Sequence, residues 1–305
     1  MFVSCHNDQS PNIGIARAGY NNMSRLNLRD QALKNKSTST LSPKEDPDPI
    51  TRPKSLERII QEQIEESVAE YRRSNKGLFL SALTAGLDLG FSLLVIGVLY
   101  TMFSGKVSME IMQVITALAY PIGFIFVILG RSALFTEHTT LAALPVLSGR
   151  ESIKSLARIW GIIYVGNLLG GYVIGAAIAY IGPRLGLVSY DALEKIAHHL
   201  IDYSAPLILV SAILAGWLMG LVSWLATSSK ETIARIVIVI IVTGVIGLGG
   251  LHHSIVGSTE VFAGLLSSDE ITVSDYLTTQ LWSTIGNIIG GVFFVSILKF
   301  QVAKK

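Results

Sequence analysis

Six apolar segments, each long enough to cross a lipid bilayer, restrict the possible folds of this chain more than any other feature. A helix rises about 1.5 Å per residue, so about 20 apolar residues span the ~30 Å hydrocarbon core. Half of the 305 residues are hydrophobic and only 15% are charged, too few polar groups to cover a soluble fold of this size. The sequence therefore predicts an all-α membrane protein with spans at residues 78–103, 114–147, 159–181, 205–227, 236–266 and 281–300.

The second and fifth segments are too long for one straight crossing, and polar residues interrupt both. LFTEHTT (residues 134–140) lies in the second segment and LHHS (residues 251–254) in the fifth. A break in a membrane helix leaves backbone groups unpaired, at a cost on the order of several kcal/mol each unless they face a polar cavity or are packed in protein. Both segments are therefore predicted to be broken helices beside a common site.

Nearly the same hexapeptide occurs in the third and sixth segments, as GNLLGG at residues 166–171 and GNIIGG at 286–291. This repetition, and the two broken segments, divide the chain into two units of three spans, the second inserted upside down because three is odd. Such inverted repeats place a substrate site near the membrane midplane. The glycines are interpreted as close helix contacts. For Asn167 and Asn287, a pore role and a helix-linking role are equally open.

Basic residues in the short flanks orient the chain, because Lys and Arg gather on the cytoplasmic side. With the amino terminus inside, twelve such residues lie on the cytoplasmic side and three on the other. The three are Lys106, Arg184 and Lys195; the twelve are Arg58, Arg72, Arg73, Lys76, Arg150, Lys154, Arg158, Lys230, Arg235, Lys299, Lys304 and Lys305. Both termini are therefore expected in the cytoplasm.

The chain begins with a polar stretch. Residues 1–53 have too little apolar surface to offset the entropy of ordering, which predicts a disordered cytoplasmic tail; within it, Met23 is an alternative start and Cys5 is the one cysteine. Residues 54–76 carry apolar residues at helical spacing, which predicts an amphipathic cytoplasmic helix on the membrane surface or, alternatively, packed on its own chain. Residues 77–305 form the predicted six-helix transmembrane channel domain.

Ionisable residues occur at both breaks. Glu137 and His138 follow Thr136 in the first, and His252 and His253 lie in the second. An imidazole can exchange a proton near neutral pH, and a proton would neutralise a weak-acid anion, whose bare charge meets a penalty on the order of 20 kcal/mol in hydrocarbon. His253 is therefore the predicted proton donor, whereas His252 has an even chance of a structural role.

Three other ionisable residues carry less specific signals. Asp88 lies in the middle of the first segment, where a proton-relay role and a hydrogen bond to a neighbouring helix are equally open. His198 and His199 fall in an outer loop, so we expect them to be exposed to solvent.

Three stretches together resemble the formate/nitrite transporter family. They are FIFVILGRSALFTEHTTLAALPVLSGR (residues 124–150), GLGGLHHSIVGS (247–258) and TIGNIIGG (284–291). The resemblance spans roughly residues 55–300 and is nearest to an inner-membrane branch of the family. It implies an aquaporin-like fold in the plasma (inner) membrane, assembled as a homo-pentamer with one pore per protomer. Small monovalent anions or their protonated acids would pass through that pore.

The resemblance also assigns residues to the pore. Leu134, Phe135 and Thr136 match the loop that gates the pore from the cytoplasmic side. His253 matches the central pore histidine, and Asn287 matches an asparagine near it.

Further positions match the constrictions of such pores or depart from the family pattern. Tyr120 and Phe124 match the cytoplasmic constriction and Ile246 the periplasmic one, although the family usually carries Phe in place of Tyr120 and Ile246. The residue before the central histidine is commonly acidic, but here it is His252. Two positions that usually hold Lys and Asn carry Leu200 and Gly216. Because of these departures, the sequence does not determine which anion permeates.

The leading hypothesis is a passive or proton-linked channel for a small weak-acid anion, with a channel for neutral solutes such as water or glycerol as the alternative. Two less favoured hypotheses are a regulatory protein whose tail recruits a partner, and a membrane metalloenzyme with His138, His252, His253 and Glu137 as ligands. The sequence has no phosphate-binding loop and no basic face with interleaved aromatic residues. We therefore expect no enzymatic activity, no cofactor or metal, and no nucleic-acid partner.

Overall fold

The computed structural model describes residues 53–303. The predicted tail up to residue 52, Lys304 and Lys305 lie outside the described residues. Within the described range the chain forms helices joined by loops, as expected of backbone that must satisfy its own hydrogen bonds in lipid. Five helical stretches of this range are long and apolar enough to cross a membrane. The prediction of an all-α membrane protein is confirmed.

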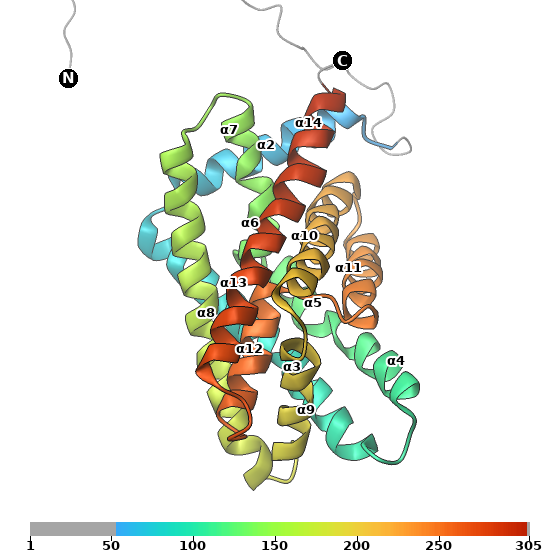
Figure 1. Cartoon of the computed structure of the whole chain (residues 1–305). Helices are drawn as coiled ribbons and strands as arrows, with labels where there is room; N and C mark the ends of the chain where they lie inside the picture. The colour runs from blue at the N-terminus through green and yellow to red at the C-terminus, as the bar shows by residue number, and fades with distance from the viewer. Residues whose placement is uncertain (1–52, 304–305) are drawn as a thin grey trace, which may run out of the picture. The chain divides into compact units, whose positions relative to one another are not determined.

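The five spanning stretches overlap five of the six predicted segments, and the predicted segment 236–266 corresponds to two shorter apolar helices (Figure 1). The unbroken segments are α3 (Asn75–Phe103), α8 (Ile153–Arg184), α10 (Ala205–Ser228) and the continuous stretch α13 (Val273–Ile289), π-helical η1 (Gly290–Ile297) and α14 (Leu298–Ala303). Helix α3 packs along α8, and α10 packs along α13 and η1.

Both predicted segments are interrupted, but the first break lies at residues 131–134, and all of LFTEHTT after Leu134 is helical. In the second segment, α4 (Met109–Ala119) and α5 (Pro121–Gly130) lead to Arg131, which has a positive φ of 54°, and the chain resumes in α6 (Phe135–Leu141) and α7 (Ala143–Leu147). In the fifth, α11 (Thr232–Leu248) leads to Gly250, with φ 58°, and then to α12 (Ser254–Leu265). Neither α11 nor α12 reaches the length of a full span. We call α6 and α12 the two half-helices.

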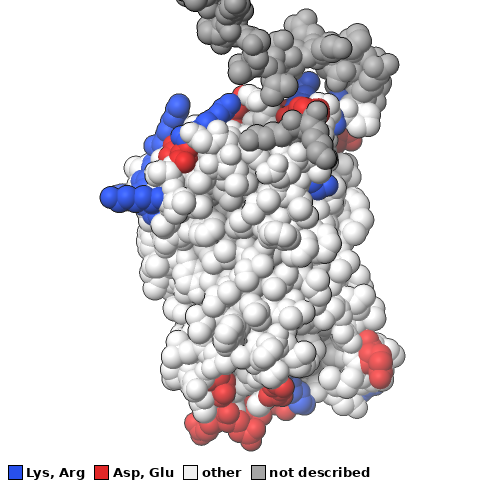
Figure 2. Space-filling view, turned by 45° about the horizontal axis from the view of Figure 1, so that its top comes forward, with Lys and Arg blue, Asp and Glu red and all other residues white. Residues whose placement is uncertain are grey.

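Helix α2 (Leu56–Arg72) lies across one end of the spanning helices, beside α7 and α14, and α9 (Tyr190–Ile201) lies at the opposite end (Figure 1). We call these the α2 end and the α9 end. Lys and Arg gather at the α2 end, and the belt between the two ends is almost free of charged side chains on the face seen in Figure 2.

The apolar face of α2 packs on protein and not on the membrane surface. Ile59, Ile60 and Ile64 are buried in a cluster with side chains of α7, α10 and η1. The Ser67 hydroxyl donates to the Leu141 carbonyl oxygen at 2.8 Å, and the Tyr71 hydroxyl donates to the Ala142 carbonyl oxygen. Helix α2 thus satisfies carbonyl groups left at the end of α6. Ser67 and Tyr71 lie on the same buried face of α2 as Ile60 and Ile64, so this face contributes both apolar packing and hydrogen bonds.

Candidate functional site

Asn167 ties the first break to the helices around it. Its side chain is fully buried; Oδ1 accepts the Phe135 N–H at 2.7 Å, and Nδ2 donates to the carbonyl oxygens of Ala82 at 2.7 Å and Ala133 at 2.9 Å. Phe135 is the first residue of α6, where a backbone N–H has no partner within the helix. One amide therefore pairs three backbone groups at the interruption.

Asn287 makes the same three contacts at the second break. Its Oδ1 accepts the N–H of Ser254, the first residue of α12, at 2.8 Å. Its Nδ2 donates to the carbonyl oxygens of Ala212 at 2.8 Å and His252 at 3.0 Å. Both amide hydrogens are thus used by backbone groups, and these contacts favour the helix-linking interpretation for both asparagines.

The glycines that follow these asparagines allow close contacts in matching places. A Cβ atom added at Gly170 would overlap a backbone carbonyl oxygen of α3, and one at Gly290 would overlap a carbonyl oxygen of α10. At Gly171 it would overlap a threonine hydroxyl of α12, and at Gly291 a threonine hydroxyl of α6. GNLLGG therefore contacts the first break through Asn167 and the second half-helix, α12, through Gly171. GNIIGG contacts the second break through Asn287 and the first half-helix, α6, through Gly291.

The two half-helices meet at His253, the residue that caps α12. Its Nδ1 accepts the Val256 N–H at 3.2 Å, so Nδ1 carries no proton and the ring proton lies on Nε2. Nε2 then donates to the Thr136 hydroxyl of α6 at 2.8 Å. The ring also packs edge-on against Phe124, with centroids 5.2 Å apart. An imidazole that is only 1% exposed thus joins groups from both breaks.

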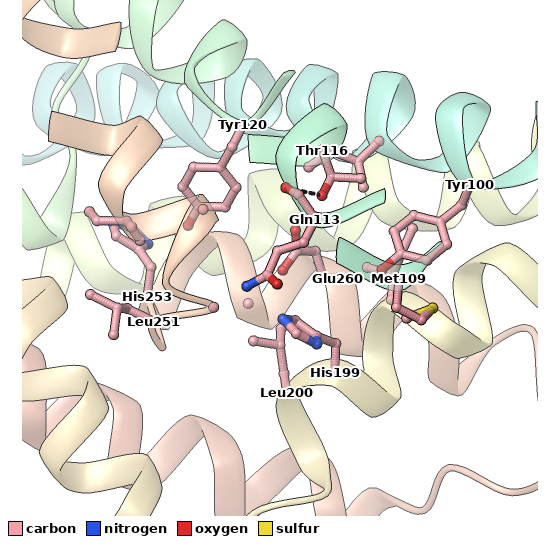
Figure 3. A pocket seen from close by; sticks show the side chains of 16 residues that line it. Tyr100, Met109, Gln113, Thr116, Tyr120, His199, Leu200, Leu251, His253 and Glu260 are labelled. Atoms are coloured by element: carbon pink, nitrogen blue, oxygen red, sulfur yellow. Dashed lines mark hydrogen bonds between the residues drawn. The ribbon is translucent and has the colours of Figure 1, made fainter. Parts of the chain in front are cut away.

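A cavity of about 120 Å³ extends from His253 toward the α9 end (Figure 3), with room for several water molecules. Its inner part is formed by Tyr120, Ile246 and His253, which are at most 7% exposed, whereas Met109 at the outer part is 70% exposed. Leu200 lines its side, and neither Lys nor Arg contributes to the lining. The cavity is a vestibule that ends at the imidazole.

The residues predicted for the site fall into two groups. Tyr120, Ile246 and His253 line the vestibule, and Phe124 and Thr136 contact His253 directly. Tyr120 and Ile246 were predicted for opposite constrictions, but both lie in this one cavity, which extends toward the α9 end.

The other predicted residues have protein contacts away from the vestibule lining. Leu134 is a fully buried residue at the start of α6, and Phe135 packs against aromatic rings of α8. The ring of His252 donates from Nε2 to the Leu200 carbonyl oxygen at 2.9 Å, and its Nδ1 is hydrogen-bonded to the Ser211 hydroxyl at 2.9 Å. Its contacts are those of a structural histidine.

The sequence does not predict five polar residues of the vestibule: Tyr100, Gln113, Thr116, His199 and Glu260. Helix α9, which the sequence analysis treated as a loop, brings His199 to the outer part of the cavity. Glu260 could have been noticed, because it is the one charged residue in the α12 sequence SIVGSTEVFAGL.

The four residues considered as metal ligands do not form a ligand cluster. Within the described part of the chain, suitable ligand atoms converge within 4.8 Å of one another only at Glu194, His198 and Glu270, near the surface of the α9 end. There His198 Nδ1 lies 2.9 Å from Asp202 Oδ1, and this hydrogen bond raises the pKa of His198. The metalloenzyme hypothesis therefore has no support at the two breaks.

Interrupted apolar helices around a buried vestibule define a multi-pass membrane transport protein. The model of the formate/nitrite transporter family matches residues 57–301, and the chain belongs to this family, whose members are channels and transporters.

Individual relatives agree with this assignment. Inner membrane protein YfdC of Escherichia coli (strain K12) is 32% identical over 232 residues, covering 75% of this chain and 73% of YfdC. Formate channel FocA of Haemophilus influenzae is 25% identical, covering 72% and 76%. A solved structure of an FNT family ion channel has the same fold, with a TM-score of 0.73 at 22% identity over 80% of this chain and 98% of that one.

Proposed function

We propose that this protein is a passive or proton-linked channel for a small monovalent weak-acid anion of the formate or nitrite kind, and not an enzyme. The observation that carries the proposal is the hydrogen bond from His253 Nε2 to Thr136 Oγ1, where the two half-helices meet at the inner end of the vestibule. The family supports transport of this class of solute.

In the proposed mechanism, an anion in the vestibule accepts the Nε2–H hydrogen bond of His253 in place of Thr136. Nδ1 gives up the Val256 N–H and takes a proton from a hydronium ion of the surrounding water, and the resulting imidazolium passes its Nε2 proton to the anion. The neutral acid avoids most of the cost of moving a charge through a low-dielectric region. Phe124 and Ile246, both fully buried, are proposed to keep continuous water out of the path. Thr136 is the proposed second polar contact, in a gating loop with Leu134 and Phe135, while Asn287 holds the break in shape.

The assembly and the orientation are part of the proposal. A solved structure with a TM-score of 0.62 at 19% identity is titled as a pentameric formate channel with formate bound, and we infer a homo-pentamer for this chain. The equivalent contacts of Asn167 and Asn287 support two inverted three-helix units. The basic residues at the α2 end support a cytoplasmic location of that end, with both termini inside.

Flux into liposomes tests the role of His253. Purified protein should carry at least one of formate, nitrite, acetate, lactate or hydrosulfide faster than protein-free vesicles do. His253→Ala should reduce that flux at least tenfold, since a general proton donor contributes roughly 10²- to 10⁴-fold. His198→Ala is the matched control, because His198 lies outside the vestibule lining, and it should leave the flux unchanged. Equal flux through wild type and His253→Ala would exclude the mechanism.

The alternative is a channel for neutral solutes, and one observation favours it: no Lys or Arg lines the vestibule to attract an anion. Water or glycerol permeation that is unaffected by a proton gradient, without any acid flux, would establish this alternative.

A further inference from the structure

Glu260 carries a buried carboxyl group in the middle of α12, and this group faces the vestibule (Figure 3). The residue is 6% exposed, and among the residues that the structure describes its side chain has neither a hydrogen bond nor an ion pair. Buried polar groups in proteins normally have a partner, because leaving one unpaired is costly. The unpaired carboxyl group therefore points to a ligand that enters the cavity.

Glu260 lies between the mouth of the vestibule and His253. Both residues and Gly257 line the cavity, and their spacing of four and three residues places them on one face of α12. Seven residues correspond to roughly 10 Å along the helix. A small anion held at Glu260 is thus too far from the imidazole to accept its hydrogen bond, so Glu260 marks a position separate from His253.

No fixed positive charge lines this part of the path. Lys195 belongs to an adjoining outer pocket that shares Tyr100 and His199 with the vestibule. There its Nζ donates to Asp191 Oδ2 at 2.8 Å and to the Ser104 hydroxyl at 3.0 Å. Lys195 is not among the residues that line the vestibule. Once an anion has left the mouth, it must be held by uncharged hydrogen-bond donors.

Such donors gather around Glu260. Tyr100 and Tyr120 line the same cavity, and within the described part of the chain neither phenolic O–H has a hydrogen-bond partner. Gln113 Nε2 donates to the Leu248 carbonyl oxygen at 2.6 Å and has a second N–H to donate. A protonated carboxyl group adds one more O–H donor. The vestibule can therefore surround an anion with donors without any cation.

The protonation state of Glu260 decides whether it takes part. An ionised carboxylate would have no counter-charge in the vestibule lining and would repel an anion beside it. A protonated carboxyl group has neither disadvantage. Its hydrogen bond to an anion is also shorter and roughly twice as strong as one between two neutral groups. Only the protonated form of Glu260 is compatible with both its burial and an anion in the cavity.

We propose that Glu260, in its protonated form, is the main hydrogen-bond donor of an outer binding site that holds the permeating anion before it reaches His253. The ligand is a small carboxylate or nitrite-like anion, whose oxygen accepts the carboxyl O–H, with Tyr100 and Tyr120 as further donors. Glu260 keeps its proton and binds, whereas His253 transfers one. The inference rests on the proposed function, because it adds a binding step to that pathway.

Infrared difference spectroscopy of the full chain in liposomes at neutral pH, with and without formate, tests the hydrogen bond. A protonated carboxyl group has a C=O stretching band that a carboxylate or an amide lacks, and the band shifts when the O–H donates to an anion. Subtracting the spectrum of Glu260→Gln isolates the band of Glu260 from those of other carboxyl groups. Wild type should show this band and shift it with formate. An absent band, or one that formate leaves unshifted, would overturn the inference.

The concentration dependence of formate flux into the same liposomes is the second readout. Glu260→Gln retains a donor of similar size, so its half-saturating formate concentration should stay within about threefold of wild type. Glu260→Met has no donor and should raise that concentration by about tenfold or more, because it loses a hydrogen bond to a charged group. Glu270→Met is the matched control, since the Glu270 side chain is 75% exposed at the α9 end, and it should behave like wild type.

Size-exclusion profiles and thermal melting confirm that each variant is folded. A folded Glu260→Met variant with the concentration dependence of wild type would overturn the inference, and so would a Glu260→Gln variant that loses affinity as Glu260→Met does. Either result leaves the proposed function standing. If wild type moves no probe acid, the proposed function falls, and the formate-dependent infrared band still decides whether Glu260 binds the anion.

Discussion

The two helix breaks use the same backbone contacts and carry different side chains at the same place. At each break, the N–H two residues before the half-helix faces a serine hydroxyl at 3.1 Å, and an asparagine amide pairs the next groups. The N-cap residue, immediately before the half-helix, is Leu134 in the first break and His253 in the second, with closely similar φ and ψ angles.

The two breaks share the contacts that stabilise the backbone, and they differ in the side chain at the N-cap position. Leu134 has no side chain that can cap α6, whereas His253 caps α12 through Nδ1 and points Nε2 at Thr136. The asparagines and glycines solve a problem of unpaired backbone groups that both breaks share. The imidazole and the vestibule that ends at it belong to one break alone.

We expect the largest loss of stability when either asparagine is replaced. Comparing the two substitutions tests whether the two breaks are equivalent. Asn167→Ala and Asn287→Ala each remove three hydrogen bonds from buried backbone groups, which should lower the free energy of unfolding by about 3–5 kcal/mol. Thermal melting of the detergent-solubilised protein measures the loss. A variant that melts with wild type would show that its break is held by other contacts and would end the comparison.

The glycines after the asparagines should give a smaller effect. Gly170→Ala and Gly290→Ala place a methyl group against a backbone carbonyl of the neighbouring helix, and such overpacking costs about 1–3 kcal/mol. Gly161→Ala, in the same helix as Gly170, has open space around its Cβ position and should not destabilise the protein. The melting temperatures of the three variants test this prediction. If Gly170→Ala lowers the melting temperature and Gly290→Ala does not, the helices pack less tightly at the second break.

The smallest expected effect sharpens the distinction between the two adjacent histidines. His252→Ala converts the second break to the alanine that the first break has at the corresponding position, Ala133. It removes hydrogen bonds to Ser211 and Leu200 and should cost about 1–2 kcal/mol in stability. Acid flux per folded protein should remain within twofold of wild type. A flux as low as that of His253→Ala would place His252 in the conduction path.

Much of the fold could be predicted because its signals are local. Segment length and hydropathy located the spanning helices, and polar residues inside two overlong segments located the breaks. The site was only partly predictable. Helix α12 is buried on nearly all sides, so its sequence has no polar face to indicate which residues turn toward a cavity. Glu260 was missed although it is the one charged residue of α12, because nothing in the sequence shows which side of this helix faces the cavity. His253 was predicted as the proton donor, whereas the role of His252 stayed open between the pore and a structural contact.

The sequence by itself determined that the chain crosses a membrane in helices, where two of them break, and that the same hexapeptide recurs in two of the spans. Only the tertiary structure decided what the polar side chains near the breaks do. It turned Asn167 and Asn287 onto backbone groups, His252 onto Ser211 and Leu200, and Glu260 into the vestibule. The physical reason is that apolar length is a property of one segment, whereas the partner of a buried polar group comes from helices far away in the chain.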